Sequence, residues 1–238
     1  MSIIVPAYNE ECRLPGSLEK IVNYVTSQAE CMEVLVVENG SCDHTTEIAE
    51  SYAARYPFVQ VLHSEKGKGA AVRAGMLAGR GRYLFMCDSD LSMPIGELSK
   101  FLPPILDDYD VAIGSREGPG ARRYGEPPYR HLMGRVFNLI VRVLAIPQFQ
   151  DSQCGFKSFR REVACEIFPE LTMTGWSFDV EALFIALHRG NKVVTVPINW
   201  YFDADSRVNP VRDTIRMVKD VWQIRVNGWR GAYDRQPH

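Results

Sequence analysis

The chain has 238 residues, of which 46% are hydrophobic and 24% charged, and its formal net charge is −2. These totals are typical of a globular protein of one or two domains, and they exclude a strongly basic, general nucleic-acid-binding protein. The six cysteines form no C-x-x-C pair, which disfavours a zinc site, and their scatter predicts reduced thiols in a cytosolic protein.

Short apolar runs alternate with helical patterns through the first half of the chain. Leu18, Ile21 and Val25, for example, have the spacing of one helix face. Strands are expected at 2–7, 32–39, 58–64, 82–88 and 110–115. Helices are expected at 13–28, 43–56 and 68–78, with a broken helix at 95–106. This alternation predicts βαβ units, and therefore an α/β fold with a mostly parallel sheet.

The second half is less regular. Residues 116–130 are rich in Gly, Pro and Arg and are expected to form a mobile loop. Helices are expected at about 129–144, 160–168, 177–190 and 210–228, with an irregular segment at 150–157 and a strand at 191–198. No clean boundary interrupts the chain, so we expect a single domain over residues 1–238.

The chain shows no sign of a leader or of a membrane span. Its first residues, MSIIVPAYNEE, hold neither a basic segment nor a cleavable apolar one. No apolar run approaches the roughly 18 residues that suggest a membrane span, and the best, at 136–147, is interrupted by Arg142. A role at a membrane would therefore place the protein on its surface.

Polar side chains follow four of the expected strands. They are Tyr8 to Glu10, Glu38 with Asn39, Asp88 to Asp90, and Ser115 with Arg116. In open α/β sheets, ligands bind in the crevice beyond the carboxyl ends of the strands. The four strand ends therefore predict one ligand-binding edge.

The most specific of these segments is CDSDLSMP, residues 87–94. Residues two apart along a strand point to the same side, so the carboxylates of Asp88 and Asp90 are expected to repel each other unless a cation lies near them. Mg²⁺ and Mn²⁺ prefer oxygen ligands, and Mg²⁺ commonly takes one or two carboxylates with substrate phosphates. A metal–diphosphate site is expected here; the alternative is a solvated turn in which an aspartate caps a helix.

Other residues of this edge suit a nucleotide. Pro6 and Tyr8 offer a rigid platform and an aromatic face, and Glu10 and Glu38 could accept hydrogen bonds from ribose and from a base N–H group.

A second glycine-rich turn could hold a phosphate. In SEKGKGAAVRAG, residues 64–75, two glycines precede an expected helix, whose N-terminus could bind the anion together with Lys66 and Lys68. The alternative is a plain glycine turn with surface lysines.

Taken together, these segments resemble the family 2 glycosyltransferases with a GT-A fold. The first-half matches are SIIVPAYNEE, VLVVENGSCDHT, KGKGAAVRAG, CDSDLSMP and AIGSR. In the second half, DSQCGFKSFRR, GWSFDVEALFIA and VPINW followed by DSRV are similar to the dolichyl-phosphate glucosyltransferase branch and to bacterial polyprenyl-phosphate glycosyltransferases. The resemblance spans roughly residues 2–228.

The resemblance implies an inverting transfer that depends on Mg²⁺ or Mn²⁺. The donor would be a nucleotide-diphospho-sugar and the acceptor a polyprenyl or dolichyl phosphate. UDP-glucose fits the branch best; the alternatives are GDP-mannose, a soluble acceptor, or a non-catalytic nucleotide-sugar-binding module. Residues 1–115 would form the nucleotide-sugar-binding half and residues 116–238 the acceptor-binding half. The protein would be cytoplasmic and peripheral to the cytoplasmic face of a membrane.

The resemblance also assigns residues by position. The donor would be bound by Pro6, Ala7, Tyr8, Glu10, Glu38, Lys68, Asp88, Ser89, Asp90 and Arg207, the last paired with Ser206. The metal would be held by Asp88 and Asp90. Acceptor binding and the reacting centre would involve Arg116, Arg130 and Asp179; a helix N-cap is the alternative for Asp179.

Two positions depart from the family pattern. Glu38-Asn39 stands where many relatives have two aspartates, and Ser92 stands where mannose-transferring relatives often have Gln.

Two segments of the second half mix arginines with apolar and aromatic residues, at 122–142 and at 210–230. Basic and apolar side chains on amphipathic helices suit contact with a membrane surface. Core packing with a solvated opposite face is the alternative.

Overall fold

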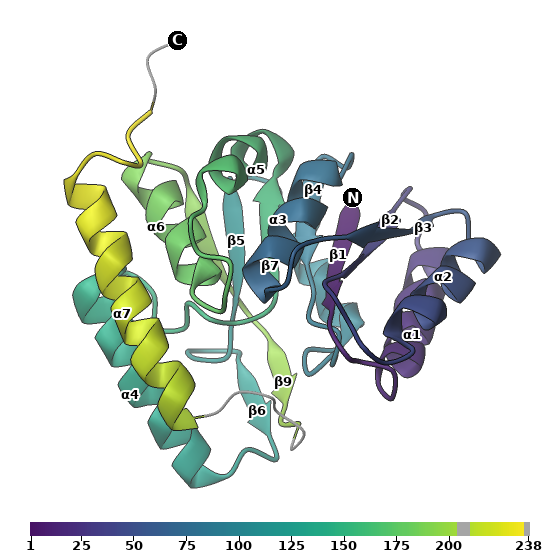
Figure 1. Cartoon of the computed structure of the whole chain (residues 1–238), viewed down its shortest axis with the longest axis horizontal. Helices are drawn as coiled ribbons and strands as arrows, with labels where there is room; N and C mark the ends of the chain where they lie inside the picture. Colours follow the sequence, from purple (N-terminus) through teal and green to yellow (C-terminus); the bar gives the residue numbers. More distant parts are fainter. Residues whose placement is uncertain (204–209, 236–238) are drawn as a thin grey trace.

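A seven-stranded sheet forms the centre of the molecule in the computed structural model, which describes residues 1–203 and 210–235, with backbone alone for 210–213 (Figure 1). The strand order is β3-β2-β1-β4-β7-β5-β8. The strands are β1 (Ser2–Ala7), β2 (Glu33–Glu38), β3 (Val59–His63), β4 (Tyr83–Met86), β5 (Val111–Ser115), β7 (Lys157–Arg160) and β8 (Val193–Pro197). All neighbours pair in parallel except β7, which is antiparallel to both β4 and β5. The expected α/β fold with a mostly parallel sheet is confirmed.

Helices cover both faces of the sheet, so every residue of β1 is buried. Alternate β1 residues enter two different cores: Ile3 and Val5 pack on one face, and Ile4 packs on the other. The first face carries α1 (Leu14–Ser27), α2 (Thr45–Arg55) and the 3₁₀ helix η1 (Ile95–Phe101). The second carries α3 (Lys68–Ala78), α5 (Arg161–Ile167), the 3₁₀ helix η2 (Phe168–Glu170) and α6 (Phe178–His188).

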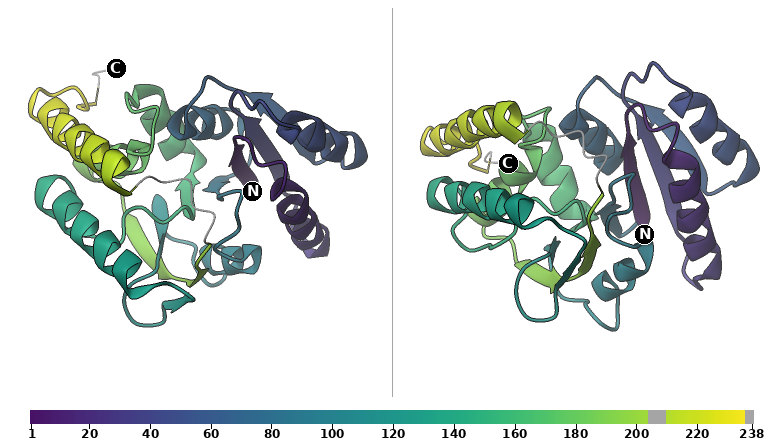
Figure 2. Two further views of the ribbon diagram at one scale, coloured as in Figure 1. Left: turned by 60° about the horizontal axis from the view of Figure 1, so that its bottom comes forward. Right: turned by 90° about the horizontal axis from the view of Figure 1, so that it is seen from below.

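Two long helices, α4 (Pro128–Leu144) and α7 (Pro210–Trp229), lie side by side beyond α6 (Figures 1 and 2). They add their inner residues to the second core, among them Phe137 and Val141 of α4 and Val221 and Ile224 of α7. Within the described ranges, no helix is both long and apolar enough to cross a bilayer.

The structure differs from the sequence expectation at three places. Strand β7 begins inside a segment expected to be irregular. The segment expected to be a mobile loop contains β6 (Arg122–Tyr124), which pairs in parallel with β9 (Asn199–Tyr201). The expected broken helix at 95–106 is a 3₁₀ helix that ends at Phe101. The single-domain organisation and the division at residue 115 remain predictions.

Candidate active site

The carboxyl ends of β1, β2, β4 and β5 meet at one edge of the sheet, and antiparallel β7 begins there. Two residues at this edge have the left-handed backbone that non-glycine residues rarely adopt: Asn9 after β1, at φ +52°, and Leu91 after β4, at φ +48°. Such strained positions cluster at functional sites. The four expected strand ends therefore do form one edge, and it carries two backbone outliers.

Asp88 and Asp90 lie in a turn rather than on a strand. Strand β4 ends at Met86, and the Leu91 N–H group donates to the Asp88 carbonyl oxygen at 3.2 Å. The expectation that both carboxylates extend along a strand was wrong, because the chain turns two residues earlier. The turn still holds them close enough to interact, since the charge of Asp88 acts on Asp90.

The carboxylate of Asp88 lies directly over the backbone of Gly155. A β-carbon at position 155 would overlap Asp88 Oδ2, so only glycine leaves room for this side-chain position. Asp90 is fixed by the Ser92 N–H group, which donates to Asp90 Oδ1 at 2.9 Å. Burial, and then the negative charge of Asp88, raise the pKa of the Asp90 carboxyl above its usual value.

These features fit a divalent cation that is completed by ligands from the substrate. Two negatively charged carboxylates that repel each other are stabilised by a cation beside them. In addition, Asp88 Oδ1 is buried and accepts no well-aligned hydrogen bond. In the described part of the chain, no group of three or more His, Cys, Asp or Glu side chains could hold a metal. The donor set is therefore two carboxylates, which is the number Mg²⁺ commonly takes in sites where substrate phosphates supply further oxygens.

Lys68, the first residue of α3, reaches this pair. Its Nζ lies 2.6 Å from Asp88 Oδ1 and 5.0 Å from the centre of the Trp176 ring. The expected phosphate site at the N-terminus of α3 is not open, because the N–H groups of Gly69 and Ala70 already donate to the Thr174 carbonyl oxygen, at 2.9 and 3.3 Å. The side chains of Lys66 and Lys68, and not these two N–H groups, therefore remain for an anion.

Asp179 lies at the start of α6 and is only 5% exposed. Its Oδ2 lies 3.0 Å from Nζ of Lys157, which is 1% exposed and also donates to the Cys154 carbonyl oxygen at 2.6 Å. Asp179 Oδ1 is buried and has no hydrogen-bond partner in the described structure. Burial raises the pKa of Asp179, although Lys157 and Lys68 act in the opposite direction. The side chain is thus no helix cap: one oxygen is held by a buried lysine and the other is available.

The residues expected to bind a nucleoside surround the ends of β1 and β2. Pro6 and Ala7 end β1, and Lys66 Nζ lies 4.8 Å from the centre of the Tyr8 ring. Burial alone would raise the pKa of Glu38, but hydrogen bonds from Ser41 and His63 outweigh it and lower the pKa. Ser89, which was expected to bind the donor, is buried and stands between Asp88 and Asp90 in the chain.

Glu10 is already engaged. Its two carboxylate oxygens accept from Nε and Nη2 of Arg13, at 2.8 and 2.9 Å, and Arg13 also pairs with Asp203 at 3.0 Å. This bidentate contact fixes Glu10 at the edge of the site. Arg207 and Ser206, which follow Asp203, lie outside the described residues.

The two arginines expected to bind the acceptor differ in their surroundings. Arg116 Nε and Nη2 each donate at 2.8 Å to the buried carboxylate of Asp151, which also accepts from the Arg116 N–H group. Burial would raise the pKa of Asp151, but Arg116 outweighs it and lowers the pKa to about 2. Arg130, near the start of α4, makes no ion pair with a described residue and lies 5.7 Å from the centre of the Phe202 ring.

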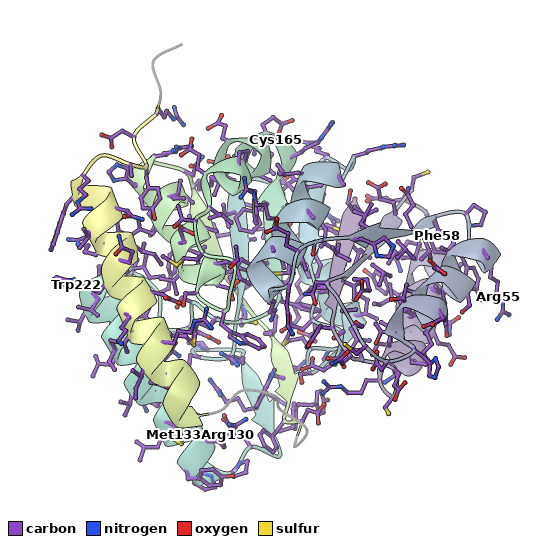
Figure 3. All side chains as sticks on the ribbon, in the orientation of Figure 1. Arg55, Phe58, Arg130, Met133, Cys165 and Trp222 are labelled. Atoms are coloured by element: carbon purple, nitrogen blue, oxygen red, sulfur yellow. The ribbon has the colours of Figure 1, made fainter. Side chains whose placement is uncertain are left out.

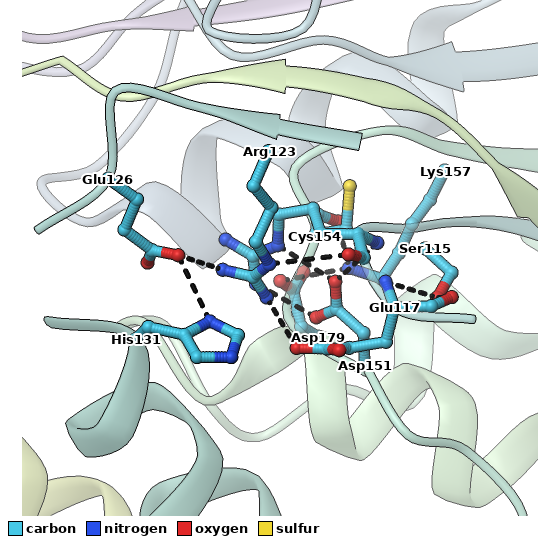
Figure 4. Close-up of polar contacts among 10 residues, drawn as sticks. Ser115, Glu117, Arg123, Glu126, His131, Asp151, Cys154, Lys157 and Asp179 are labelled. Atoms are coloured by element: carbon cyan, nitrogen blue, oxygen red, sulfur yellow. Dashed lines mark hydrogen bonds and ion pairs between the residues drawn. The ribbon is translucent and has the colours of Figure 1, made fainter. Parts of the chain in front are cut away.

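A third arginine, Arg123, was considered from the sequence only as part of the basic stretch at 122–142, without a role at the site. It lies between Glu117 and Glu126, at 2.9 and 2.8 Å, and donates to the Arg116 carbonyl oxygen at 3.2 Å (Figure 4). His131 Nδ1 lies 3.1 Å from the same Glu126 oxygen. These contacts tie the segment at 116–131 into an ordered network, so Arg130 is the one of the three arginines left without a carboxylate among the described residues.

Sequence reasoning missed Lys157, Asp151 and Gly155, which act on Asp179, Arg116 and Asp88 respectively. All three belong to DSQCGFK, a segment that was quoted as a match without roles for its residues. The sequence did offer a signal of their importance, because this short segment contains an acidic residue, a glycine and a basic residue. The partner of each became evident only with the antiparallel placement of β7.

A family model described as "Glycosyl transferase family 2" matches residues 2–168. Among curated proteins, the chain is 34% identical over 238 aligned residues to a dolichyl-phosphate beta-glucosyltransferase of Trichomonas vaginalis, covering 94% of this chain and 70% of that protein. It is 32% identical to the dolichyl-phosphate beta-glucosyltransferase of Homo sapiens, covering 98% of this chain and 77% of the human protein.

Among solved structures, the chain is similar to glucosyl-3-phosphoglycerate synthase from Mycobacterium tuberculosis in complex with Mn²⁺, uridine-diphosphate and phosphoglyceric acid. The TM-score is 0.68 at 18% identity, covering 99% of this chain and 79% of the other. A complex of the same enzyme with uridine-diphosphate gives a TM-score of 0.69 at 18% identity, covering 95% and 78%. At this identity the likeness shows the fold alone.

Proposed function

Since this chain belongs to the glycosyl transferase family 2, we propose that it transfers glucose from UDP-glucose to a dolichyl or polyprenyl phosphate at a membrane surface. The observation that carries this proposal is the meeting of Asp88, Asp90, Lys68 and Asp179 at one sheet edge, in a chain whose relatives at 32–34% identity are dolichyl-phosphate beta-glucosyltransferases. Because the sugar of UDP-glucose is α-linked, a β-linked product means inversion at the anomeric carbon.

The donor would lie across the ends of β1, β2 and β4. Glu38, whose pKa is lowered by its hydrogen bonds, stays ionised and could accept from a base N–H group. Tyr8 would offer its ring, and Glu10, held by Arg13, would face the ribose. Asp88 and Asp90 would hold Mg²⁺ or Mn²⁺, which would neutralise charge on the departing diphosphate. The complexes of the mycobacterial neighbour with Mn²⁺ and with Mg²⁺ support a divalent cation.

The proposed nucleophile, the phosphate group of the lipid acceptor, needs little activation. A phosphate monoester has a second pKa of about 6, so most of it is doubly ionised at neutral pH and no general base has to remove a proton. The obstacle is the approach of one anion to another. Arg130 has no carboxylate partner in the described structure and could bind the acceptor phosphate through its guanidinium.

Arg116 would act differently from the original expectation of a direct phosphate contact. Two of its guanidinium nitrogens are already bound to Asp151, which leaves Nη1 for a ligand. We assign it mainly to holding the segment that carries Arg123 and, further along, Arg130.

Asp179 would orient the donor sugar. Its free Oδ1 is a buried acceptor, and a sugar hydroxyl is the donor that the proposed substrate would bring to it. Lys157 holds the other oxygen, so the carboxylate has a fixed direction. Asp179 would thus act as a hydrogen-bond acceptor, and no general base would take part in the transfer.

The membrane contact would be made by α4 and α7. One face of α4 packs inward through Phe137 and Val141, yet other large apolar side chains of the helix are exposed. They are Tyr129, Leu132, Met133, Val136, Leu139 and Val143. On α7, Trp222 points outward (Figure 3), and Trp229 is also exposed. Arg135 and Arg142 are exposed on α4 as well. Apolar and basic side chains on such a surface suit anionic lipid headgroups and would place the protein on the cytoplasmic face.

The test is transfer of radiolabelled glucose from UDP-glucose to dolichyl phosphate in detergent micelles, with Mn²⁺ or Mg²⁺. We expect the label to enter the organic phase with the lipid. GDP-mannose in place of UDP-glucose tests the donor. Label found only on a water-soluble acceptor would overturn the lipid assignment, and binding of nucleotide-sugar without turnover on any acceptor would make the protein a binding module.

A further inference from the structure

The backbone fixes the position from which Lys68 reaches the acidic pair. Gly67 has φ +137°, and a β-carbon there would overlap the Thr174 carbonyl oxygen. The same oxygen accepts from the N–H groups of Gly69 and Ala70, so the start of α3 is pinned to the loop before α6. The loop is in turn held by Glu181, whose carboxylate accepts from the N–H groups of Thr172 and Met173. The backbone of Lys68 is therefore held in place by these contacts, and the side chain extends from it toward Asp88.

The ammonium group of Lys68 lies among carboxylates. It pairs with Asp88 at 2.6 Å, and the charges of Asp179 and Asp90 also act on it. Burial would lower the pKa of Lys68, but these carboxylates outweigh it and raise the pKa, so the side chain stays positively charged. The contact with Asp88 is close, yet it lacks the alignment of a regular hydrogen bond.

The Lys68 ammonium group and a divalent cation would compete for Asp88 Oδ1, because both are positively charged and both would need the same lone pairs. A cation that takes Asp88 leaves a largely buried ammonium group without its partner, which is costly. A diphosphate would remove that cost by offering new oxygens to Lys68. Lysine suits such an exchange, since its charge is compact and its four-carbon chain is flexible.

We propose that the Lys68 ammonium group pairs with Asp88 when no metal is bound. When a nucleoside diphosphate binds, Lys68 pairs with its phosphate oxygens instead, and Asp88 becomes free to bind a divalent cation. The inference rests on the proposed donor site. Metal and nucleotide then bind with positive coupling, and each must raise the affinity for the other by the same factor. The protein would bind Mn²⁺ weakly alone and take it up with the nucleotide.

The test measures Mn²⁺ binding to the full chain by electron paramagnetic resonance, with and without UDP and without any acceptor. Lys68→Met keeps an unbranched side chain, one atom shorter than lysine, and removes the charge. We expect it to bind Mn²⁺ about tenfold more tightly than the wild type in the absence of UDP, within the range usual for coupling between sites. We expect the enhancement by UDP to shrink by a similar factor.

Lys66→Met is the matched control, because Lys66 lies two residues before Lys68 and contacts Tyr8 rather than Asp88. It should leave Mn²⁺ affinity without UDP nearly unchanged. Lys68→Gln serves if the methionine variant does not fold, as judged by circular dichroism.

Equal Mn²⁺ affinity of the wild type and the Lys68 variants without UDP would overturn the proposal, as would an equal gain with Lys66→Met. If the wild type transfers glucose but the Mn²⁺ affinity does not change in the Lys68 variants, this inference fails and the proposed function stands.

Discussion

Nζ of Lys157 lies 3.0 Å from Oδ2 of Asp179, and both side chains are buried. Lys157 stands at the start of β7, between Met86 of β4 and Ile113 of β5, and thus comes from the one antiparallel strand of the sheet. Its charge is what opposes the effect of burial on Asp179. The ionised form of a site carboxylate therefore depends on a residue that faces the interior.

Lys157→Met tests this dependence. Without Lys157 the pKa of Asp179 should rise further, so activity that needs the carboxylate falls at neutral pH and recovers as the pH is raised. Breaking a buried pair should also lower the free energy of unfolding by about 3–5 kcal/mol. The measurements are the pH profile of kcat and urea unfolding.

Lys192→Met is the control, since Lys192 pairs with Asp108 on the surface, where solvent screens the ion pair and its loss should change stability little. The double variant Lys157→Met/Asp179→Asn should recover stability without recovering activity. A pH profile identical to that of the wild type would remove Lys157 from the account.

Asp90→Ala should abolish transfer, because it removes one of the two carboxylates proposed to hold the metal. Turnover is to be measured at saturating metal and donor. Asp107→Asn, an exposed aspartate away from the sheet edge, is the control and should keep full activity. Near-wild-type turnover of Asp90→Ala would exclude that carboxylate from the mechanism.

Arg130→Ala should weaken binding of the acceptor more than binding of the donor. A hydrogen bond to a charged group contributes about 1.5–3 kcal/mol, so the KM for the lipid phosphate should rise roughly tenfold to a hundredfold. Arg122→Ala, on the exposed side of β6, is the matched control. Equal effects on the KM values of donor and acceptor would contradict this role.

Arg116→Met should destabilise the fold in a pH-dependent way. The pKa of Asp151 is lowered to about 2 in the folded protein, so its pairing contributes stability that is full above the unfolded value near 4 and is lost as the pH falls through about 2. The shift corresponds to about 2 kcal/mol. Urea unfolding between pH 7 and 3 should show that the free energy of unfolding differs between wild type and variant, and that this difference becomes smaller at low pH. A difference that stays constant with pH would mean that the Arg116–Asp151 pair does not cause it.

Leu139→Glu with Val143→Glu should reduce flotation with vesicles of phosphatidylcholine and phosphatidylglycerol. Both side chains are exposed on α4, so the melting temperature should change little. Leu77→Glu places the same charge on an exposed apolar site of α3 and should leave flotation unchanged. Undiminished flotation of the α4 variant would exclude this helix as the contact.

The regular first half was predictable because its strands are buried on both faces and read as continuous apolar runs. Strand β7, with the sequence KSFR, carries no such run, and an isolated polar tetrapeptide gives no periodic signal. Its partners are far away in sequence: Lys157 faces Met86 and Ile113, and no local pattern encodes that pairing. The turn at Asp88 was missed for a related reason, since an apolar run shows that a strand exists more clearly than where it stops.

Strand β7 belongs to the half of the chain after residue 115, yet it lies between β4 and β5, which belong to the half before it. Cutting the chain at residue 115 would leave β5 with no neighbour on either side, since β8 also comes from the later half. Chimaeras that exchange donor and acceptor halves between relatives at that point would therefore interleave strands of two origins within one sheet. A chimaera that keeps Asp88 must also keep a glycine at position 155, because any β-carbon there would overlap the Asp88 carboxylate.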